Sequence, residues 1–599
     1  MANRYVSFRK RLSLRLPWWA ALLPALMLVA VSRPDGQSVE RLEAQPAPQH
    51  PAHRPDAAGY LGSEVCADCH EDIYRSYRNT PMGRSIVPAD AEAVSKLAVP
   101  ASFANPSIDR NFSVFVKGGS LYQGESANAA DGTVIFETTH DVRWLIGAGV
   151  NGYGPVVERN GFLFQAPLSY YTKPMAWGPS PGYEAVDLGF NRPLLPGCIT
   201  CHAGRANYVA GTNGRYTEPV FAEPAIGCEN CHGPGAAHVQ TMLTSHNTGR
   251  ATLIVNPKRL TPYMADNICM QCHQMGDARV LQPGKSYADI RPGRPLDDIL
   301  AIVMIPPTRE TPPDADHTQH DYAMTLSRCF RASGGRMSCL TCHDPHTQPS
   351  PAEAPAYYRQ RCLTCHTNQS CKLSLPQRMA QQPANDCIRC HMPKRDIQTI
   401  SHSTATNHRI LARPDEPFPA VAFEHKGQPI PDLLHLDPAP DKEHVPLPLL
   451  TQLQVYGALA ADHPQYVDRY LEVLKQLEVS DAHNAVVQAA AGRRDLKAGN
   501  LPSAIAHLTR ATALADPEAT TCADLAEALA RAGQGETALP WLDRAIALDP
   551  FNPFTQRNRI LLLLQLHHYP RVRAALTTYV ETFPQDSYMR QMLAKVPAP

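Results

Sequence analysis

The pattern Cys-x-x-Cys-His occurs seven times between residues 66 and 391, and it constrains the fold more than any other feature of the chain. It is typical of c-type haem attachment. The two thiols add to vinyl groups at one porphyrin edge, and the adjacent histidine ligates the iron. Numbered in chain order as motifs 1 to 7, the occurrences are CADCH at Cys66, CITCH at Cys198, CENCH at Cys228, CMQCH at Cys269, CLTCH at Cys339, CLTCH at Cys362 and CIRCH at Cys387.

Other chemistries that use paired cysteines fit this pattern poorly. Zinc sites need two Cys-x-x-Cys pairs per metal and do not require a histidine after each pair. Iron–sulfur clusters likewise do not require a histidine directly after each cysteine pair. A thioredoxin-like redox pair would occur once, near a strand-to-helix turn. The sequence therefore predicts seven covalently bound haems c.

The residues predicted to hold these haems are of two kinds. The attachment cysteines are Cys66, Cys69, Cys198, Cys201, Cys228, Cys231, Cys269, Cys272, Cys339, Cys342, Cys362, Cys365, Cys387 and Cys390. The proximal iron ligands are His70, His202, His232, His273, His343, His366 and His391.

A second ligand on each iron decides between electron transfer and substrate chemistry. A haem with two strong axial ligands mainly moves electrons, whereas an open position can bind a substrate. The motif region supplies enough further histidines for seven distal ligands, with one to spare. The candidates are His140, His238, His246, His317, His320, His346, His402 and His408. His238 and His346 follow their motifs so closely that each is expected to reach a neighbouring haem; Met82 and Met324 are weaker candidates, more typical of packing.

Sixteen of the 17 cysteines precede residue 391, and two of them belong to no motif. These two, Cys329 and Cys371, could pair as a disulfide in an oxidising compartment or remain as buried free thiols. Their sequence separation does not decide between these alternatives.

Composition narrows the class of protein further. The 56 basic and 56 acidic residues balance, which removes the electrostatic argument for nucleic-acid binding. Residues 1–32 combine a basic start with the apolar run from Pro17 to Val31, shorter than the about 20 residues that span a membrane. We interpret this segment as a cleaved export signal; the alternative is an N-terminal anchor, which would be the only membrane contact. Either one implies a periplasmic or extracellular protein.

Five further regions follow from patterning. Residues 33–58 form a Pro-, Ala- and Gln-rich linker, and residues 59–410 the predicted heptahaem domain. Within that domain, about 100–195 alternates with period two and carries hairpin turns at Gly118-Gly119 and Asn160-Gly161. A small antiparallel insertion is expected there. A Pro-rich connector, 411–447, precedes an Ala/Leu-rich domain, 448–599.

That last domain has a 34-residue period typical of tetratricopeptide (TPR) helical pairs. Residues that correspond across three repeats are Ala504, Ala538 and Val572; Leu508, Leu542 and Leu576; and Ala511, Ala545 and Tyr579. Pro550 and Pro584 close two of the repeats. The alternative is a generic helical bundle. The fold class expected is mixed but mainly α: a loop-rich multihaem domain with a small antiparallel β insertion, then a TPR solenoid.

The segments CADCHEDIYRSYRNTPMGRS, CENCHGPGAAH, SCLTCHDPH and CIRCHMPK, the last followed by SHSTATNHRI, resemble periplasmic multihaem cytochromes with TPR tails. These are related to the tetrahaem cytochromes of nitrifying bacteria and, in haem packing, to hydroxylamine oxidoreductase and nitrite reductase. The resemblance implies stacked haem pairs and supports His238, His346 and His408 as distal ligands. The chain lacks the Cys-x-x-Cys-Lys motif of ammonia-forming nitrite reductases and has one haem motif fewer than hydroxylamine oxidoreductases. These departures argue against transferring either activity.

The function expected is electron transfer along seven haems, with redox proteins as partners and the TPR domain for protein docking. An electron carrier is favoured over an enzyme. One alternative is a haem enzyme that reduces or oxidises a small nitrogen or sulfur compound at one five-coordinate haem, for which motif 1 is the first place to look. Another is a cytochrome subunit of a larger complex or filament.

Overall fold

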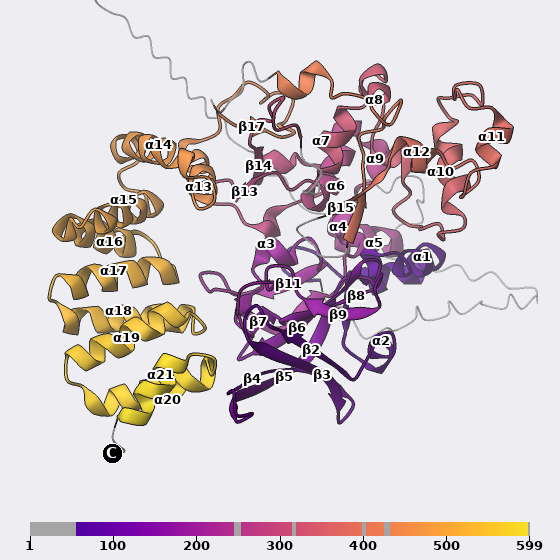
Figure 1. Cartoon of the computed structure of the whole chain (residues 1–599). Helices are drawn as coiled ribbons and strands as arrows, with labels where there is room; N and C mark the ends of the chain where they lie inside the picture. Colours follow the sequence, from indigo (N-terminus) through magenta and orange to yellow (C-terminus); the bar gives the residue numbers. More distant parts are fainter. Residues whose placement is uncertain are drawn as a thin grey trace, which may run out of the picture. The chain divides into compact units, whose positions relative to one another are not determined.

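The computed structural model describes residues 55–244, 253–313, 319–397, 403–424, 430 and 432–596 (Figure 1). The predicted signal segment 1–32, nearly all of the linker and three candidate ligands, His246, His317 and His402, lie outside the described residues. None of the described helices is both long and apolar enough to cross a membrane.

A ten-stranded antiparallel sheet dominates the N-terminal half, so the expectation of a mainly α protein with a small β insertion is wrong. The main path runs β10-β7-β6-β5-β4-β3-β2; β1 pairs with β5, and β8 pairs with β6 and β9. The strands are β1 (Ile86–Pro88), β2 (Ala101–Asn105), β3 (Arg110–Lys117), β4 (Ser120–Asn128), β5 (Val134–Ile146), β6 (Gly152–Arg159), β7 (Phe162–Gln165), β8 (Leu168–Tyr171), β9 (Ala176–Pro179) and β10 (Arg192–Pro193).

The physical reason for this error lies in how the strands are buried. Both expected hairpins are present, because Gly118-Gly119 joins β3 to β4 and Asn160-Gly161 joins β6 to β7 with positive φ at all four turn residues. Several of the other strands are too short or too evenly buried to show a period of two. β8 is buried throughout and reads as a continuous apolar run, and a register shift between Val142 and Trp144 interrupts the alternation of β5.

Each haem motif lies on or at the end of a short helix. The motif helices are α1 (Ser63–Arg78), α3 (Pro196–Ile199), α4 (Cys228–His232), α6 (Pro262–His273), α9 (Cys339–Cys342), α10 (Ala354–Cys362) and α12 (Cys387–His391). The helices between them are α2 (Ala91–Val94), α5 (Ala236–Thr244), α7 (His320–Thr325), α8 (Arg328–Ala332) and α11 (Leu375–Met379). Most span only one or two turns, so they give the region little helical core of its own.

Three small sheets and several 3₁₀ turns complete this region. The sheets are β11 (Arg205–Tyr208) with β12 (Tyr216–Glu223), β13 (Ala278–Leu281) with β14 (Leu300–Met304) and β17 (Leu434–His435), and β15 (Lys394–Ile397) with β16 (Ser403–Thr406). The 3₁₀ turns are η1 (Met82–Arg84), η2 (Pro257–Arg259), η3 (Tyr287–Asp289), η4 (Leu296–Asp298), η5 (Ala420–Phe423) and η6 (Pro464–Tyr466).

The C-terminal part of the chain is a succession of antiparallel helices (Figure 1). They are α13 (Leu449–Leu459), α14 (Val467–Ser480), α15 (Ala485–Lys497), α16 (Leu501–Leu514), α17 (Ala519–Arg531), α18 (Gly535–Leu548), α19 (Pro553–Gln565), α20 (Tyr569–Thr582) and α21 (Ser587–Lys595). All nine residues picked out by the 34-residue period are buried at the contacts of α16, α18 and α20 with their neighbours. The period therefore reports the packing of repeated helical pairs.

Candidate haem-binding site

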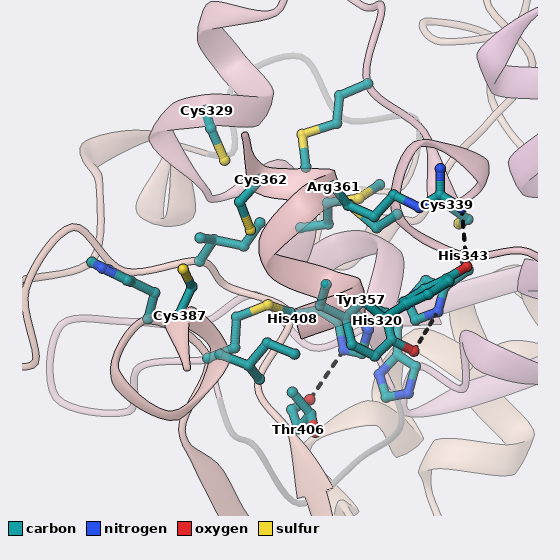
Figure 2. A pocket seen from close by; sticks show the side chains of 18 of the residues that line it. His320, Cys329, Cys339, His343, Tyr357, Arg361, Cys362, Cys387, Thr406 and His408 are labelled. Carbon is teal, nitrogen blue, oxygen red and sulfur yellow. Dashed lines mark hydrogen bonds between the residues drawn. The ribbon is translucent and has the colours of Figure 1, made fainter. Parts of the chain in front are cut away.

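A cavity of about 1310 Å³ lies among the motif helices. It exceeds the roughly 300–1,000 Å³ of a typical small-molecule pocket, so it suits more than one large group. Figure 2 shows part of its wall, where the sulfur atoms of Cys362 and Cys387 face one another. The motif residues that line it are Cys201, Cys231, Cys269, Cys272, Cys339, Cys342, Cys362, Cys387, Cys390, His273, His343, His366 and His391.

The helical form of the motifs explains their spacing. Positions three and four apart share one face of a helix, so both thiols and the histidine of a motif are presented to the same side. In α12, the Asp386 side chain accepts hydrogen bonds from the backbone N–H groups of Ile388 and Arg389 and starts the helix at the motif. Motifs 3 and 7, which lie entirely within α4 and α12, can thus offer their three haem-binding side chains as a unit.

Three motif histidines have a second imidazole opposite them. Ring centroids are 5.9 Å apart for His232 and His346, with planes 6° from parallel. The corresponding distances are 5.4 Å for His273 and His320 and 6.2 Å for His343 and His408. Two imidazoles on opposite sides of one metal ion would have centroids about 6 Å apart, given metal–nitrogen bonds of about 2 Å. The centroid distances of these pairs therefore match those of two histidines that ligate one haem iron.

Two of these pairs form one cluster. The rings of His320 and His408 stack with centroids 4.0 Å apart (Figure 2). Burial, followed by the neighbouring His408, His273 and His343, lowers the pKa of His320 to about 2. Burial is also the largest cause that lowers the pKa of His408 to about 4. Both rings are thus held in the neutral form, which is the form that binds metals.

Backbone carbonyls orient several of the rings. The Nδ1 atom of His232 lies 2.7 Å from the Val255 carbonyl oxygen, that of His391 lies 2.5 Å from the Leu411 carbonyl, and that of His408 lies 3.0 Å from the Thr406 carbonyl. A carbonyl only accepts, so Nδ1 is the donor in each bond. Nε2 is then left free to ligate iron, as metal-binding histidines require.

Neighbouring motifs contact one another through their thiols. The hydrogen-bonded thiol pairs are Cys66 with Cys228, Cys201 with Cys272, Cys269 with Cys339, and Cys362 with Cys387. In the second pair, the hydrogen bond lowers the pKa of Cys201 to about 7. Two further pairs are electrostatic neighbours, Cys231 with Cys269 and Cys342 with Cys365. These contacts join all seven motifs into one connected set.

The remaining sequence candidates lie in different surroundings. His140 is on β5, where its ring lies 4.5 Å from that of Phe190 and its Nε2 is 3.2 Å from the Thr138 hydroxyl. Burial, then the nearby Arg159, lowers the pKa of His140 to about 4. The structure does not bring it to a motif through these contacts. His238 is half-buried on α5.

The four other motif histidines differ in exposure. His70, His202 and His366 are exposed, and His391 is half-buried. Among the described residues, no second imidazole lies at ring-contact distance from His70. Cys329 and Cys371 both line the cavity, and both are free thiols.

Sequence reasoning missed several buried polar residues near the motifs. His435 on β17 lies 3.1 Å from Asp297, and both side chains are almost fully buried. Asp266 accepts the backbone N–H of Cys339 at 2.9 Å, and burial raises the pKa of its carboxyl to about 6. Burial also raises the pKa of Asp321 and of Asp437. Asp266 lies in a motif helix and Asp321 follows a candidate ligand, but such aspartates are too common to single out, and no motif marks His435, Asp297 or Asp437.

Comparison with known proteins identifies two segments. Residues 332–371 match the doubled CXXCH motif family, and residues 186–233 match the family described as cytochrome c554 and c-prime. Covalently bound haem c is the cofactor. The two matches indicate a multihaem c-type cytochrome, although they cover only the parts of the chain around motifs 2, 3, 5 and 6.

The search of curated proteins finds no match. Solved structures similar to part of the chain are TPR proteins. YrrB, described as a TPR protein with an unusual peptide-binding site, is 15% identical over 24% of this chain and 72% of its own, with a TM-score of 0.22. The first TPR of Spaghetti (RPAP3), bound to an HSP90 peptide, is 21% identical over 19% of this chain and 92% of its own (TM-score 0.18). MamA is 16% identical over 25% and 79% (TM-score 0.21).

Proposed function

We propose that this chain carries seven haems c and conducts electrons along them, outside the cytoplasm, between redox proteins of which one docks on the helical repeats. The observation that carries the proposal is that each motif has a cysteine thiol close enough to a thiol of another motif to shift a thiol pKa, so that the seven motifs form one connected set. The pairs of neighbouring thiols place the motifs in the spatial order 1–3–4–5–6–7, and motif 2 is a neighbour of motif 4. A chain that conducts electrons along its haems needs such continuity, because electrons pass between neighbouring haems.

The chemistry that the cofactor supplies is reversible one-electron exchange at iron. The protein contributes ligands, burial and orientation. The paired imidazoles at motifs 3, 4 and 5 would hold the irons of these haems and leave no ligand position for a substrate. Carbonyl oxygens of Val255, Leu411 and Thr406 hold the rings in the required tautomer. The close stack of His320 on His408 brings two ligand pairs together, consistent with stacked haems.

The helical repeats support a docking role. Helical-repeat solenoids present extended concave surfaces for partners. The repeats also contain none of the seven motifs. An export signal at residues 1–32 would place the protein in the periplasm or at the cell surface, and residues 1–54 are absent from the described structure, so export remains part of the proposal.

The test combines haem counting with spin state. Pyridine haemochrome analysis and intact-protein mass of the purified full-length protein should both give seven haems per chain. Low-temperature electron paramagnetic resonance (EPR) of the oxidised protein should then give low-spin signals only. A stoichiometry clearly below seven would contradict the haem count. A high-spin signal near one haem per chain would contradict exclusive two-histidine ligation.

One observation favours the enzyme as a second candidate. His70 of motif 1 is exposed, and among the described residues no imidazole lies opposite it at ring-contact distance. An open iron there would take a small nitrogen or sulfur compound. In that case the oxidised protein should show a high-spin signal that nitrite, hydroxylamine or sulfite perturbs, and His70→Ala should abolish the perturbation.

A further inference from the structure

Glu229, the second residue of motif 3, has a carboxylate that is turned into the protein. Its side chain is almost fully buried, at 5% exposure. It accepts hydrogen bonds from the backbone N–H groups of Leu61 at 3.0 and 3.1 Å, Gly62 at 2.8 Å and Gly235 at 2.8 Å. A carboxylate is tolerated in the interior only when donors of this kind satisfy its charge.

The donors come from two places that matter for haem binding. Leu61 and Gly62 directly precede α1, which carries motif 1, and Gly62 is the residue at the start of that helix. No side chain of the local sequence caps α1 there. Glu229 of motif 3 therefore accepts the N–H groups of the two residues that lead into the helix of motif 1. Its negative charge lies near the start of that helix, where the helix dipole favours it. The third donor to Glu229, the N–H group of Gly235, comes from the loop that follows motif 3.

Other contacts tie the same two elements together. The Ser63 hydroxyl accepts the backbone N–H of Cys228 at 2.9 Å, and the Ser63 N–H donates to Glu223 at 2.8 Å. Near the far end of α1, the Tyr77 hydroxyl donates to the Ile226 carbonyl at 2.8 Å. α1 is thus held to the motif 3 segment near both ends, and Glu229 provides the largest set of bonds.

We propose that Glu229 is a positioning residue that fixes motif 1 against motif 3 and thereby sets the reduction potentials and electron exchange of the two haems. This inference rests on the proposed electron-transfer function. Two effects follow from one side chain. Its hydrogen bonds determine how closely the two motifs approach, and its buried negative charge stabilises the oxidised state of nearby iron and so lowers the potential.

The test is Glu229→Gln in the full-length protein, measured by spectroelectrochemical titration and by haem counting. Glutamine has the same size, but it lacks the charge and turns an N–H₂ group toward backbone donors. We expect an unchanged haem count, an upward shift in the potentials of two haems and slower electron equilibration between them. The matched control is Glu92→Gln on α2, which removes an exposed charge that pairs only with Lys96 on the surface and should leave all potentials unchanged.

Two further variants separate geometry from charge. Glu229→Asp keeps the charge but shortens the side chain by one methylene, so it should slow the equilibration while shifting the potentials less. Ser63→Ala removes an independent bond between the same elements and should shift the same two haems in a variant that matures normally. Wild-type potentials and rates in both Glu229→Gln and Ser63→Ala would overturn the inference. A wild-type protein that lacks haems or cannot be reduced would instead refute the proposed function itself.

Discussion

The imidazoles of His320 and His408 stack 4.0 Å apart although 88 positions separate them in the sequence. His320 begins α7 and His408 follows β16, and each ring also lies opposite a different motif histidine, His273 and His343 respectively. The stack therefore links the histidine pair of motif 4 to the histidine pair of motif 5. The Asp266–Cys339 hydrogen bond joins the same two motifs through the backbone.

Removing the His408 side chain should leave one haem iron without its second histidine ligand. In His408→Ala, the ring opposite His343 is lost, but Cys339 and Cys342 still hold the haem by thioether bonds. We expect an unchanged haem count and one new high-spin ferric haem per chain in the EPR spectrum. His140→Ala is the matched control, because His140 packs on Phe190 and should leave every haem low-spin. A fully low-spin His408→Ala protein would rule out His408 as a ligand.

His346 should serve motif 3 and not its own motif 5. The ring is 5.9 Å from that of His232, whereas His343 of motif 5 lies opposite His408. His346→Ala should therefore produce a high-spin haem, and the double variant His346→Ala/His408→Ala should produce two. One high-spin haem in the double variant would mean that both histidines serve the same iron.

Acid should destabilise the protein through His140. Burial and Arg159 lower the pKa of His140 in the fold to about 4 from an ordinary value of 6.5. The unfolded chain then binds the proton first, so the stability from the neutral ring is complete above pH 6.5 and declines as pH falls toward 4. At pH 5 the loss should be about 2 kcal/mol. Urea unfolding at pH 7 and pH 5 checks this value: the pH dependence should shrink in His140→Leu, and an identical dependence in both proteins would contradict it.

How much of the fold could be predicted depended on how regular each pattern was. Leu508, Leu542 and Leu576 recur every 34 residues because each fills the same place in a repeated helix pair, so the repeat was visible in the sequence. The pair Asn160-Gly161 predicted a hairpin correctly, because a two-residue turn needs positive φ and these residue types adopt it. Leu168 to Tyr171 carried no such signal, since a strand buried on both faces looks the same as a buried helical turn. The size of the sheet was therefore underestimated.

In the candidate haem site too, some residues could be predicted from the sequence and others could not. Covalent attachment needs fixed spacing, so each motif histidine could be named from the sequence alone. A candidate distal ligand such as His346 is brought to a motif by tertiary folding, and no pattern in the sequence shows which motif it faces. The role of Glu229 could not be predicted for a related reason, because its hydrogen-bond donors Leu61 and Gly62 are 168 and 167 residues away in the sequence.

A substitution in the core of the helical repeats should lower the free energy of unfolding without changing the haem sites. Leu542 on α18 is buried in the repeat core at 3% exposure, and truncation leaves a cavity. Leu542→Ala should therefore cost about 2–5 kcal/mol of stability. Because Leu542 packs only within the repeat core cluster, the haem count and the EPR spectrum should match those of the wild type. Leu561→Ala is the matched control, since Leu561 on α19 is 43% exposed and should cost far less. Changed haem spectra in Leu542→Ala alone would show that the repeats take part in forming the haem sites, so docking would not be their only role.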